Sequence, residues 1–316
     1  MSDEQRGLGR RDFLLGAAGA AAVPMGLGAL GVPGAVAKGG GDHGHGGGGS
    51  IPREQISIQL YTVRDQLAAD LDGTLRALAR IGYRTVEHAG FHGRTAAEFK
   101  AALRRAGIKA TSGHQSVPWP FDAAAWRTQL QDAVTVGQRY IVTPVSPATF
   151  GPGGGTSLLT TAADWKAYAA ALNQAGYMAR QYGLRFGFHN HNWEFGALQD
   201  DTPLVGFDFL ISDTDPRLVH FELDLYWAWY AHRDPVQLIA MLGDRVKQFH
   251  VKDMKFNPGH VATFTDPGTG VIDFARIFRA AGDPREHEYI VERDDALAVA
   301  LNTAQVGFSY LSRIRF

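Results

Sequence analysis

The sequence alternates two kinds of segment from about residue 51 to its end. Short apolar runs, rich in β-branched and aromatic residues, take turns with longer segments in which apolar residues recur every three or four positions. The first kind is typical of strands and the second of helices. Glycines that follow the helical segments, such as Gly82, Gly107 and Gly137, allow the chain to turn back into the next strand.

Eight such repeats in about 265 residues predict a (β/α)8 TIM barrel, an α/β fold in a single domain over residues 51–316. A doubly wound open sheet is the alternative, but no Gly-rich phosphate loop follows the first strand. The predicted strands cover residues 56–61, 84–87, 109–114, 140–143, 185–191, 219–224, 246–251 and 288–292. The predicted helices cover residues 67–81, 96–106, 123–136, 162–182, 235–242, 272–281 and 296–314. We expect the loop 145–156 and the insertion 258–267 to shape specificity.

The N-terminal residues 1–37 have the features of an export signal. Arg10 and Arg11 precede a weakly apolar stretch rich in Gly and Ala, and Ala35-Val36-Ala37 offers a cleavage site. The pattern predicts a twin-arginine signal peptide, recognised by the Tat export machinery, and a periplasmic or secreted protein. An uncleaved membrane anchor is the alternative. Residues 38–50, with their runs of Gly, are interpreted as a flexible linker.

Composition excludes several classes of function. The formal net charge is -1, which gives no reason to expect a nucleic-acid partner or an anionic membrane surface. The chain has no cysteine, so disulfides, thiolate nucleophiles and zinc-thiolate sites are excluded. A homo-oligomer is compatible with this composition.

Four of the predicted strands end in His, Asp or Glu. The runs are Phe188-His189-Asn190-His191, Phe221-Glu222-Leu223-Asp224, Phe249-His250-Val251-Lys252-Asp253 and Ile290-Val291-Glu292. Side chains alternate across a strand, so the polar residues two positions apart in each run share a side. Buried carboxylates are costly without a cation, and the functional groups of a barrel gather at the carboxyl ends of its strands. The four ends therefore predict one divalent metal ion at the barrel mouth.

The donor types narrow the choice of ion. A mixed set of imidazole and carboxylate ligands suits Mn²⁺, Zn²⁺, Co²⁺ or Fe²⁺ better than Ca²⁺, and Mg²⁺ stays among the candidates. Other polar residues at strand ends are expected to face the same cavity, with aromatic side chains as its walls, an arrangement typical of sugar-binding clefts. These residues are Gln59, Tyr61, Glu87, His88, His114, Glu194, Trp193, Tyr226, Trp227 and Trp229.

Several motifs together resemble those of the xylose isomerase-like barrel superfamily, the sugar phosphate isomerase/epimerase group. They cover nearly all of residues 51–316. The motifs are Gln59-Leu60-Tyr61-Thr62-Val63-Arg64-Asp65, Gly82-Tyr83-Arg84-Thr85-Val86-Glu87, Phe188-His189-Asn190-His191-Asn192-Trp193-Glu194-Phe195, Leu223-Asp224-Leu225-Tyr226-Trp227, His250-Val251-Lys252-Asp253, Gly268-Thr269-Gly270-Val271-Ile272-Asp273 and Val291-Glu292.

The resemblance implies a ligand set for the ion. Members of this superfamily bind one divalent ion through residues of strands five to eight, which are usually Glu, Asp, His and Glu. The last three positions correspond to Asp224, His250 and Glu292, whereas the fifth-strand position falls on His189. Either His189 is the fourth ligand, or Glu194 supplies the carboxylate.

The resemblance also implies the chemistry, namely proton abstraction next to a carbonyl. The expected function is a metal-dependent isomerase or epimerase that acts on a non-phosphorylated sugar or keto-sugar. The residues expected to carry catalysis are Glu292, His191, Glu194, Lys252 and His114. The residues expected to bind substrate are Gln59, Tyr61, Glu87, Trp227 and Asp253.

Three alternatives accompany this interpretation. A lyase or dehydratase that acts on 3-keto-glycosides would use the same first step, and the change from Glu to His at position 189 favours it. A non-catalytic carbohydrate-binding barrel would hold no tightly bound metal. A nuclease of the same superfamily would need more carboxylates and a basic groove, which the charge balance does not support.

Overall fold

The computed structural model describes residues 49–151 and 154–316. The predicted signal peptide, 1–37, and all but the last two residues of the predicted linker, 38–50, lie outside the described residues. The assignment of 51–316 to a single domain stays a prediction. Within the described part of the chain, no helix combines the length and the apolarity that a membrane span requires.

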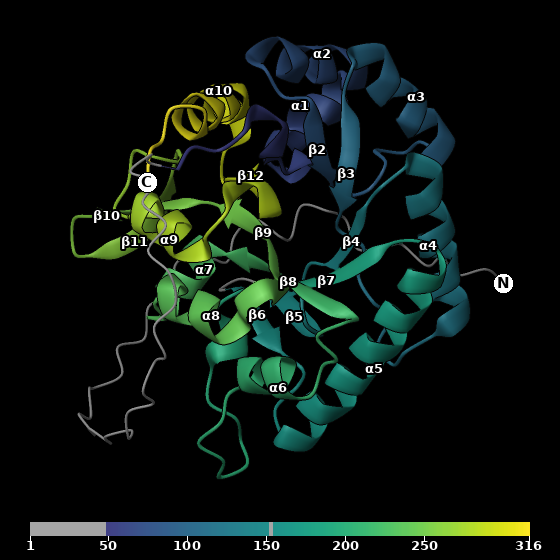
Figure 1. Ribbon diagram of the computed structural model, residues 1–316, viewed down its shortest axis with the longest axis vertical. Coiled ribbons are helices and arrows are strands. Elements are labelled where there is room, and N and C mark those ends of the chain that lie inside the picture. The colour runs from purple at the N-terminus through teal and green to yellow at the C-terminus, as the bar shows by residue number, and fades with distance from the viewer. Residues whose placement is uncertain (1–48, 152–153) are drawn as a thin grey trace, which may run out of the picture.

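Eight parallel strands of the described chain form the barrel, which confirms the predicted (β/α)8 fold (Figure 1). Six of them form one continuous sheet in the order β1-β12-β9-β8-β7-β4, and β2 pairs with β3. Parallel bridges from Gln59 to Glu87 and from His114 to Val142 join the two parts and close the cylinder. The strands are β1 (Ile56–Ile58), β2 (Thr85–His88), β3 (Lys109–Gly113), β4 (Tyr140–Thr143), β7 (Arg185–His189), β8 (Val219–Asp224), β9 (Val246–Val251) and β12 (Glu288–Val291).

Helices cover the outside of this cylinder (Figure 1). Polar caps fix several of their starts: Thr95 and Glu98 form a capping box at the start of α3, and Gly107 ends it with a left-handed backbone. The helices are α1 (Arg64–Ala69), α2 (Leu71–Ile81), α3 (Ala96–Ala106), α4 (Ala123–Val136), α5 (Ala162–Gln181), α6 (Gly206–Ser212), α7 (Leu225–Tyr230), α8 (Pro235–Leu242), α9 (Phe274–Ala281) and α10 (Ala300–Leu311).

Strand register divides the barrel residues into two sets. Residues paired across parallel strands point to the same side of the sheet. Asp224 pairs with His250, and His250 pairs with Ile290, so these three side chains share a side. Phe249, the neighbour of His250, points the other way and packs against Phe278 of α9. The layer between strands and helices is therefore apolar, while the lumen carries the polar residues.

Two predicted loops are antiparallel hairpins. The loop 145–156 contains β5 (Ala148–Gly151) and most of β6 (Gly154–Ser157). The insertion 258–267 contains β11 (Val261–Thr265), which pairs with the preceding β10 (Asp253–Asn257). The many Gly, Thr and Pro residues of the first hairpin favour turns, whereas in β10 Met254 and Phe256 alternate with polar residues, a strand signal that the prediction of a loop passed over.

Two predicted strands are shorter than expected because side chains bond to the backbone at their ends. The strand predicted over 56–61 ends at Ile58, since Gln59 accepts a hydrogen bond from the Tyr61 N–H and caps a 3₁₀ helix at Leu60–Val63. The strand predicted over 185–191 ends at His189. A short helix that was not predicted, α7, follows Asp224, whose side chain accepts the Trp227 N–H.

Candidate metal and substrate site

Four side chains at the carboxyl ends of neighbouring strands meet in the lumen. They come from β7, β8, β9 and the residue after β12, and all are buried. The His250 Nδ1 atom lies 2.6 Å from Glu292 Oε2 and 3.9 Å from Asp224 Oδ2. The His189 Nε2 atom lies 3.6 Å from Asp224 Oδ2. We refer to His189, Asp224, His250 and Glu292 as the metal group.

The donor atoms of the metal group fit a divalent cation. Asp224 Oδ1 accepts the Trp227 N–H, whereas the buried Oδ2 is bound only through its ion pair with the Lys252 ammonium, 3.0 Å away. Two imidazole nitrogens and two carboxylate oxygens are a ligand set that Mn²⁺, Zn²⁺, Co²⁺ and Fe²⁺ accept. The smaller set of Asp224, His250 and Glu292 offers ligand atoms that all lie within 4.8 Å of one another.

The charged groups beside the metal group are also compatible with a bound cation. The Lys252 Nζ atom lies 3.0 Å from Asp224 Oδ2, 2.9 Å from Glu292 Oε2 and 3.0 Å from Asp294 Oδ1. Burial lowers the pKa of Lys252, but these three carboxylates outweigh it and hold the pKa well above its usual value. The ammonium therefore stays charged. Two of these carboxylates, Asp224 and Glu292, also face His250. Burial lowers the pKa of His250, but Glu222, Glu292 and Glu87 hold it well above the usual value, so a divalent ion bound here would take the place of the His250 proton.

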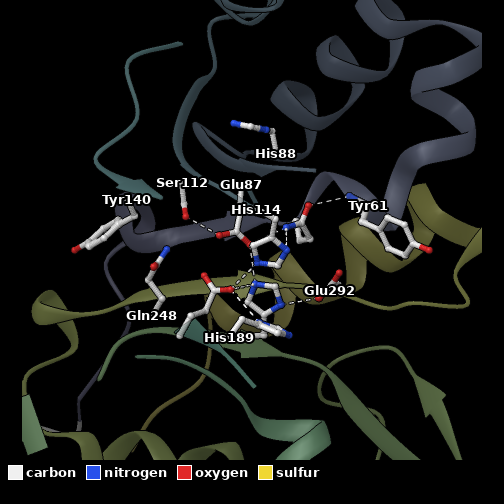
Figure 2. A network of polar contacts seen from close by, with 12 residues as sticks. Tyr61, Glu87, His88, Ser112, His114, Tyr140, His189, Gln248 and Glu292 are labelled. Atoms are coloured by element: carbon white, nitrogen blue, oxygen red, sulfur yellow. Dashed lines mark hydrogen bonds and ion pairs between the residues drawn. The ribbon is translucent and has the colours of Figure 1, made fainter. Parts of the chain in front are cut away.

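A second set of polar groups lies nearer the start of the strands; Figure 2 shows part of it, with Glu87, Ser112 and His114. Glu222 precedes Asp224 by two residues on β8, and three imidazoles converge on its Oε1 atom. The distances to Oε1 are 2.8 Å from His114 Nε2, 3.0 Å from His189 Nδ1 and 2.9 Å from His250 Nε2. Burial opposes ionisation of Glu222, but His250 and His114 hold its pKa well below the usual range.

Glu87 completes this deeper set. Its Oε1 atom lies 2.8 Å from His250 Nε2 and accepts the Gln59 amide at 2.7 Å, while its Oε2 accepts the Ser112 hydroxyl at 2.6 Å. Burial and then the charge of Glu222 raise the pKa of Glu87. We refer to Glu87, His114 and Glu222 as the inner cluster.

Aromatic rings form one wall of the mouth. The His191 ring stacks on Trp193 with centroids 4.4 Å apart and lies 5.4 Å from the Trp227 ring. Burial, and then His189 and Lys252, hold the pKa of His191 well below its usual value, so the ring is neutral. Its Nδ1 atom is buried and has no hydrogen-bond partner. Trp227 is half-buried, and its ring lies 5.9 Å from Lys252 Nζ.

Glu194 forms its hydrogen bonds with residues outside the metal group. Its carboxylate accepts the Ser146 hydroxyl at 2.7 Å and the His191 N–H at 2.8 Å, and burial raises its pKa to about 7. Of the two candidates for the fourth ligand, His189 is therefore the one that faces Asp224. Glu194 instead supports the backbone that carries His191.

The residues expected to bind substrate occupy different depths. Tyr61 is half-buried and lies under the Arg64 guanidinium, 4.1 Å from its ring centre. Gln59 and Glu87 are fully buried within the hydrogen bonds of the inner cluster. Asp253 points away from the lumen, where its carboxylate accepts the backbone N–H groups of Met254, Gly268, Gly270 and Ile272. Its oxygens are thus engaged in holding the segment after β11.

Sequence reasoning gave no role to three residues at the site: Ser146, Glu222 and Asp294. Glu222 and Asp294 each stand two positions from a predicted ligand, which is the spacing that places them on the same side of a strand or its extension. That spacing was the signal available for both. Nothing in the sequence marks Ser146, which meets Glu194 only through the folded loop.

The comparisons with known proteins agree with this architecture. The sequence pattern of the family described as Xylose isomerase-like TIM barrel matches residues 75–304, more than half of the chain. The inosose dehydratase of Geobacillus kaustophilus is 27% identical over 171 residues, which make up 49% of this chain and 54% of that protein. The chain thus spans about half the length of the curated relatives it matches.

Solved structures show the same fold. The crystal structure of a sugar phosphate isomerase/epimerase from Parabacteroides distasonis gives a TM-score of 0.67 at 24% identity, covering 82% of this chain and 98% of that chain. The structure of an L-ribulose 3-epimerase gives a TM-score of 0.59 at 16% identity, covering 81% of this chain and 92% of that chain.

Proposed function

The chain belongs to the xylose isomerase-like TIM barrel family, and from that premise we propose that it is a divalent-metal-dependent sugar isomerase or epimerase. It would remove a proton next to the carbonyl of a non-phosphorylated sugar or keto-sugar. The observation that carries the proposal is the convergence of the metal group beside a buried ammonium at the barrel mouth.

The metal group would hold the cation, with His189 in the position where the resemblance implies a glutamate. The bound ion would supply Lewis-acid polarisation of the substrate's carbonyl oxygen. The Lys252 ammonium lies against Asp224 and Glu292 and adds a second, permanent positive charge at the place where negative charge develops.

Asp294 is the carboxylate of this region with the best access to a ligand. Its side chain is 22% exposed, compared with 5% for Glu292 and 0% for Asp224. Burial raises the pKa of Asp294 to about 6, and the charges of Glu292 and Asp224 add to that rise. A carboxyl group with such a pKa can both accept and return a proton near neutral pH. We assign it this role, with Glu292 as the second candidate.

The walls of the mouth fit an uncharged substrate. Trp193 and Trp227, on either side of His191, present ring faces of the kind on which sugar C–H groups stack. Lys252 is engaged by three carboxylates, and the Arg64 guanidinium donates to the backbone oxygens of Tyr61 and Asp294. A phosphate group on the substrate would thus compete with these partners for the Lys252 ammonium and the Arg64 guanidinium.

Elimination is the second candidate outcome, as in a dehydratase or a lyase for 3-keto-glycosides. After proton removal, the enolate is either reprotonated, which gives an isomer or epimer, or expels a leaving group from the next carbon. His189 stands where a second carboxylate base would be needed for proton return from the opposite side. The similarity to an inosose dehydratase also supports elimination as an outcome.

Solvent proton exchange tests the proposal. The full chain, loaded with Mn²⁺ in D₂O, is incubated with a panel of free sugars and keto-sugars, and deuterium uptake is followed by mass spectrometry. We expect uptake that a chelator abolishes. Exchange with loss of a leaving group would select elimination, and exchange with an isomeric product would select isomerisation.

A matched pair of variants tests the assignment of Asp294. Asp294→Asn should slow exchange by about 100-fold or more, the usual worth of a general base. Asp295→Asn changes the neighbouring, exposed carboxylate, which pairs with Arg293, and should leave the rate unchanged. If no panel member exchanges, the proposed chemistry is wrong.

Export through the twin-arginine pathway remains part of the proposal, because the paired arginines precede the apolar stretch in the sequence. An extracytoplasmic location would fit free sugars better than intracellular phosphorylated ones. Replacing Arg10 and Arg11 by Lys should retain the protein in the cytoplasm, as measured by cell fractionation.

A further inference from the structure

The inner cluster touches the metal group through two shared histidines. We propose that Glu222 is a positioning residue: it fixes the tautomer of His189, so that the ring nitrogen facing Asp224 carries no proton and is available to the cation. The inference rests on the proposed function only in requiring that a divalent cation binds the metal group.

Hydrogen-bond chemistry at Glu222 carries this inference. An ionised carboxylate only accepts hydrogen bonds, so a nitrogen that faces it at bonding distance must carry the proton. His189 meets Glu222 Oε1 with Nδ1 at 3.0 Å, and His250 meets it with Nε2 at 2.9 Å. A neutral imidazole has one proton, which leaves a lone pair on His189 Nε2, the atom that lies 3.6 Å from Asp224 Oδ2. His250 differs, because carboxylates face both of its nitrogens: Nδ1 lies 2.6 Å from Glu292 Oε2 and Nε2 lies 2.8 Å from Glu87 Oε1.

A third histidine orients the carboxylate without belonging to the metal group. The Tyr61 N–H can only donate, so the Gln59 atom that accepts it at 3.0 Å is the amide oxygen. The Gln59 nitrogen therefore faces His114 Nδ1, at 3.2 Å, as a donor. This places the single proton of His114 on Nε2, which donates to Glu222 Oε1 at 2.8 Å. Glu222 is thus held in place from the side away from the cation.

The Gln59 amide also occupies the second ring nitrogen of His114. Burial lowers the pKa of His114, but the charges of Glu87 and Glu222 outweigh it and raise the pKa above the usual value. In the neutral ring, the Gln59 amide donor takes the lone pair of Nδ1. His114 is thereby a fixed donor to Glu222 and has no free lone pair for the proton-transfer role expected from the sequence.

A second cation in the inner cluster is the competing interpretation. His114, His189, Glu222 and His250 offer ligand atoms within 4.8 Å of one another. However, His250 and His189 would then each need both ring nitrogens for metal ions. Three nitrogens at 2.8–3.0 Å from one carboxylate oxygen also match ordinary N–H···O hydrogen bonds.

Metal titration of two matched variants separates these possibilities. Glu222→Gln keeps the shape of the side chain, but its amide nitrogen can turn to His189 and stabilise the opposite tautomer. Glu288→Gln makes the same change at another buried lumenal glutamate, whose partners are Thr111 and Gln248 rather than a histidine. Affinity of the full chain for Co²⁺ is measured by competition with a chelator, together with the visible spectrum of the bound ion.

We expect Glu222→Gln to weaken Co²⁺ binding by about 10- to 100-fold and to shift the spectrum, as is usual when a partner of a ligating histidine is lost. Glu288→Gln should bind within about twofold of the wild type. Wild-type affinity and spectrum in Glu222→Gln would overturn the inference, and so would two Co²⁺ ions per wild-type chain. A wild type that binds one Co²⁺ but exchanges no substrate proton would refute the proposed function alone, and one that binds none would refute both.

Histidine NMR keeps the inference testable if Glu222→Gln does not fold. In the wild-type chain without metal, ¹⁵N shifts should show His189 as the Nδ1–H tautomer and His114 as the Nε2–H tautomer. The opposite tautomer at His189 would overturn the inference.

Discussion

The lumen of the barrel and the layer between its strands and helices are both buried, yet they are filled with different chemistry. On β9, Phe249 and Val251 face the helices, whereas His250 and the residue that follows the strand, Lys252, face the lumen. The outer layer is stabilised by removing apolar surface from water, which requires no partner from outside the chain. The lumen collects carboxylates and imidazoles whose burial is costly unless every charge is balanced.

This difference indicates which part of the fold has a stability that depends on pH and on added ions. Apolar packing responds little to pH or to added ions, so the outer layer should hold the barrel together under all ordinary conditions. Buried charges respond to both. We therefore expect the stability of the lumen to vary with divalent cations and pH, and that of the outer layer to vary with neither.

Lys252→Met should give the largest effect, because it removes the ammonium that pairs with two buried carboxylates and the half-buried Asp294. The metal-free variant should lose about 3–5 kcal/mol of unfolding free energy, the usual cost of leaving buried charges without a partner. Added Mn²⁺ should restore much of this stability, since the cation then balances the carboxylates. Urea unfolding with chelator and with Mn²⁺ measures both values.

An equal loss with and without Mn²⁺ would contradict this expectation. It would mean that Lys252 acts through the packing of its aliphatic stem and not through its charge. Proton exchange should stay slow in the variant even with Mn²⁺ bound, because the second positive charge near the developing enolate is gone.

Glu288→Gln tests the pH dependence of the lumen below the metal group. Burial, and then the charges of Glu87 and Glu222, raise the pKa of Glu288 to about 7 from its ordinary 4.5. The folded state thus favours the protonated form. Glu288 therefore adds to the free energy of unfolding in full below about pH 4.5. This stabilisation is lost as the pH rises to about 7, by up to ~3 kcal/mol.

The variant cannot ionise, so it should match the wild type near pH 4.5 and be more stable at about pH 8, by up to ~3 kcal/mol. Comparing the two proteins at each pH cancels the titration of other groups. The amide that replaces the Glu288 carboxyl group could still serve both present partners, Thr111 and Gln248. A difference in stability that is the same at both pH values would show that folding does not raise the pKa of Glu288.

Much of the outer layer could be predicted from the sequence, because it rests on local patterns. The observed bounds of α4, β4, β8, α8 and β9 equal the predicted ones. Helical spacing, a following glycine and a β-branched run are all visible within a few residues. The first hairpin could not be predicted, since its residues show no apolar alternation, whereas Met254 and Phe256 of the second do alternate with polar residues and could have indicated β10.

The lumen could be predicted only in part. Alternation along a strand says which side a residue faces, and this grouped His189, Asp224, His250 and Glu292 correctly on one side. Alternation does not say how deep a residue lies, because Glu222 and Asp224 share a side but belong to different layers. Depth depends on strand stagger, which is set by the closed barrel as a whole. For that reason the sequence assigned Glu87 to the substrate and gave Glu222 no role.

Phe278→Leu should give the smallest effect and serves as the outer-layer counterpart of the two lumenal variants. Phe278 is fully buried on α9 and packs its ring 5.7 Å from Phe249 and 4.8 Å from Tyr289. Leucine keeps the apolar character and loses part of the volume, so we expect a loss of about 1–2 kcal/mol.

This loss should be the same with chelator, with Mn²⁺, and at about pH 5 and pH 8, because no charge or ligand is involved. Co²⁺ affinity should also match the wild type. Phe249 precedes His250 on β9, however, so a change in its packing could reach the metal group through the strand. If Phe278→Leu weakens Co²⁺ binding as much as Glu222→Gln does, ligand geometry is set by strand position rather than by the hydrogen bonds of the inner cluster, and the two layers are not independent.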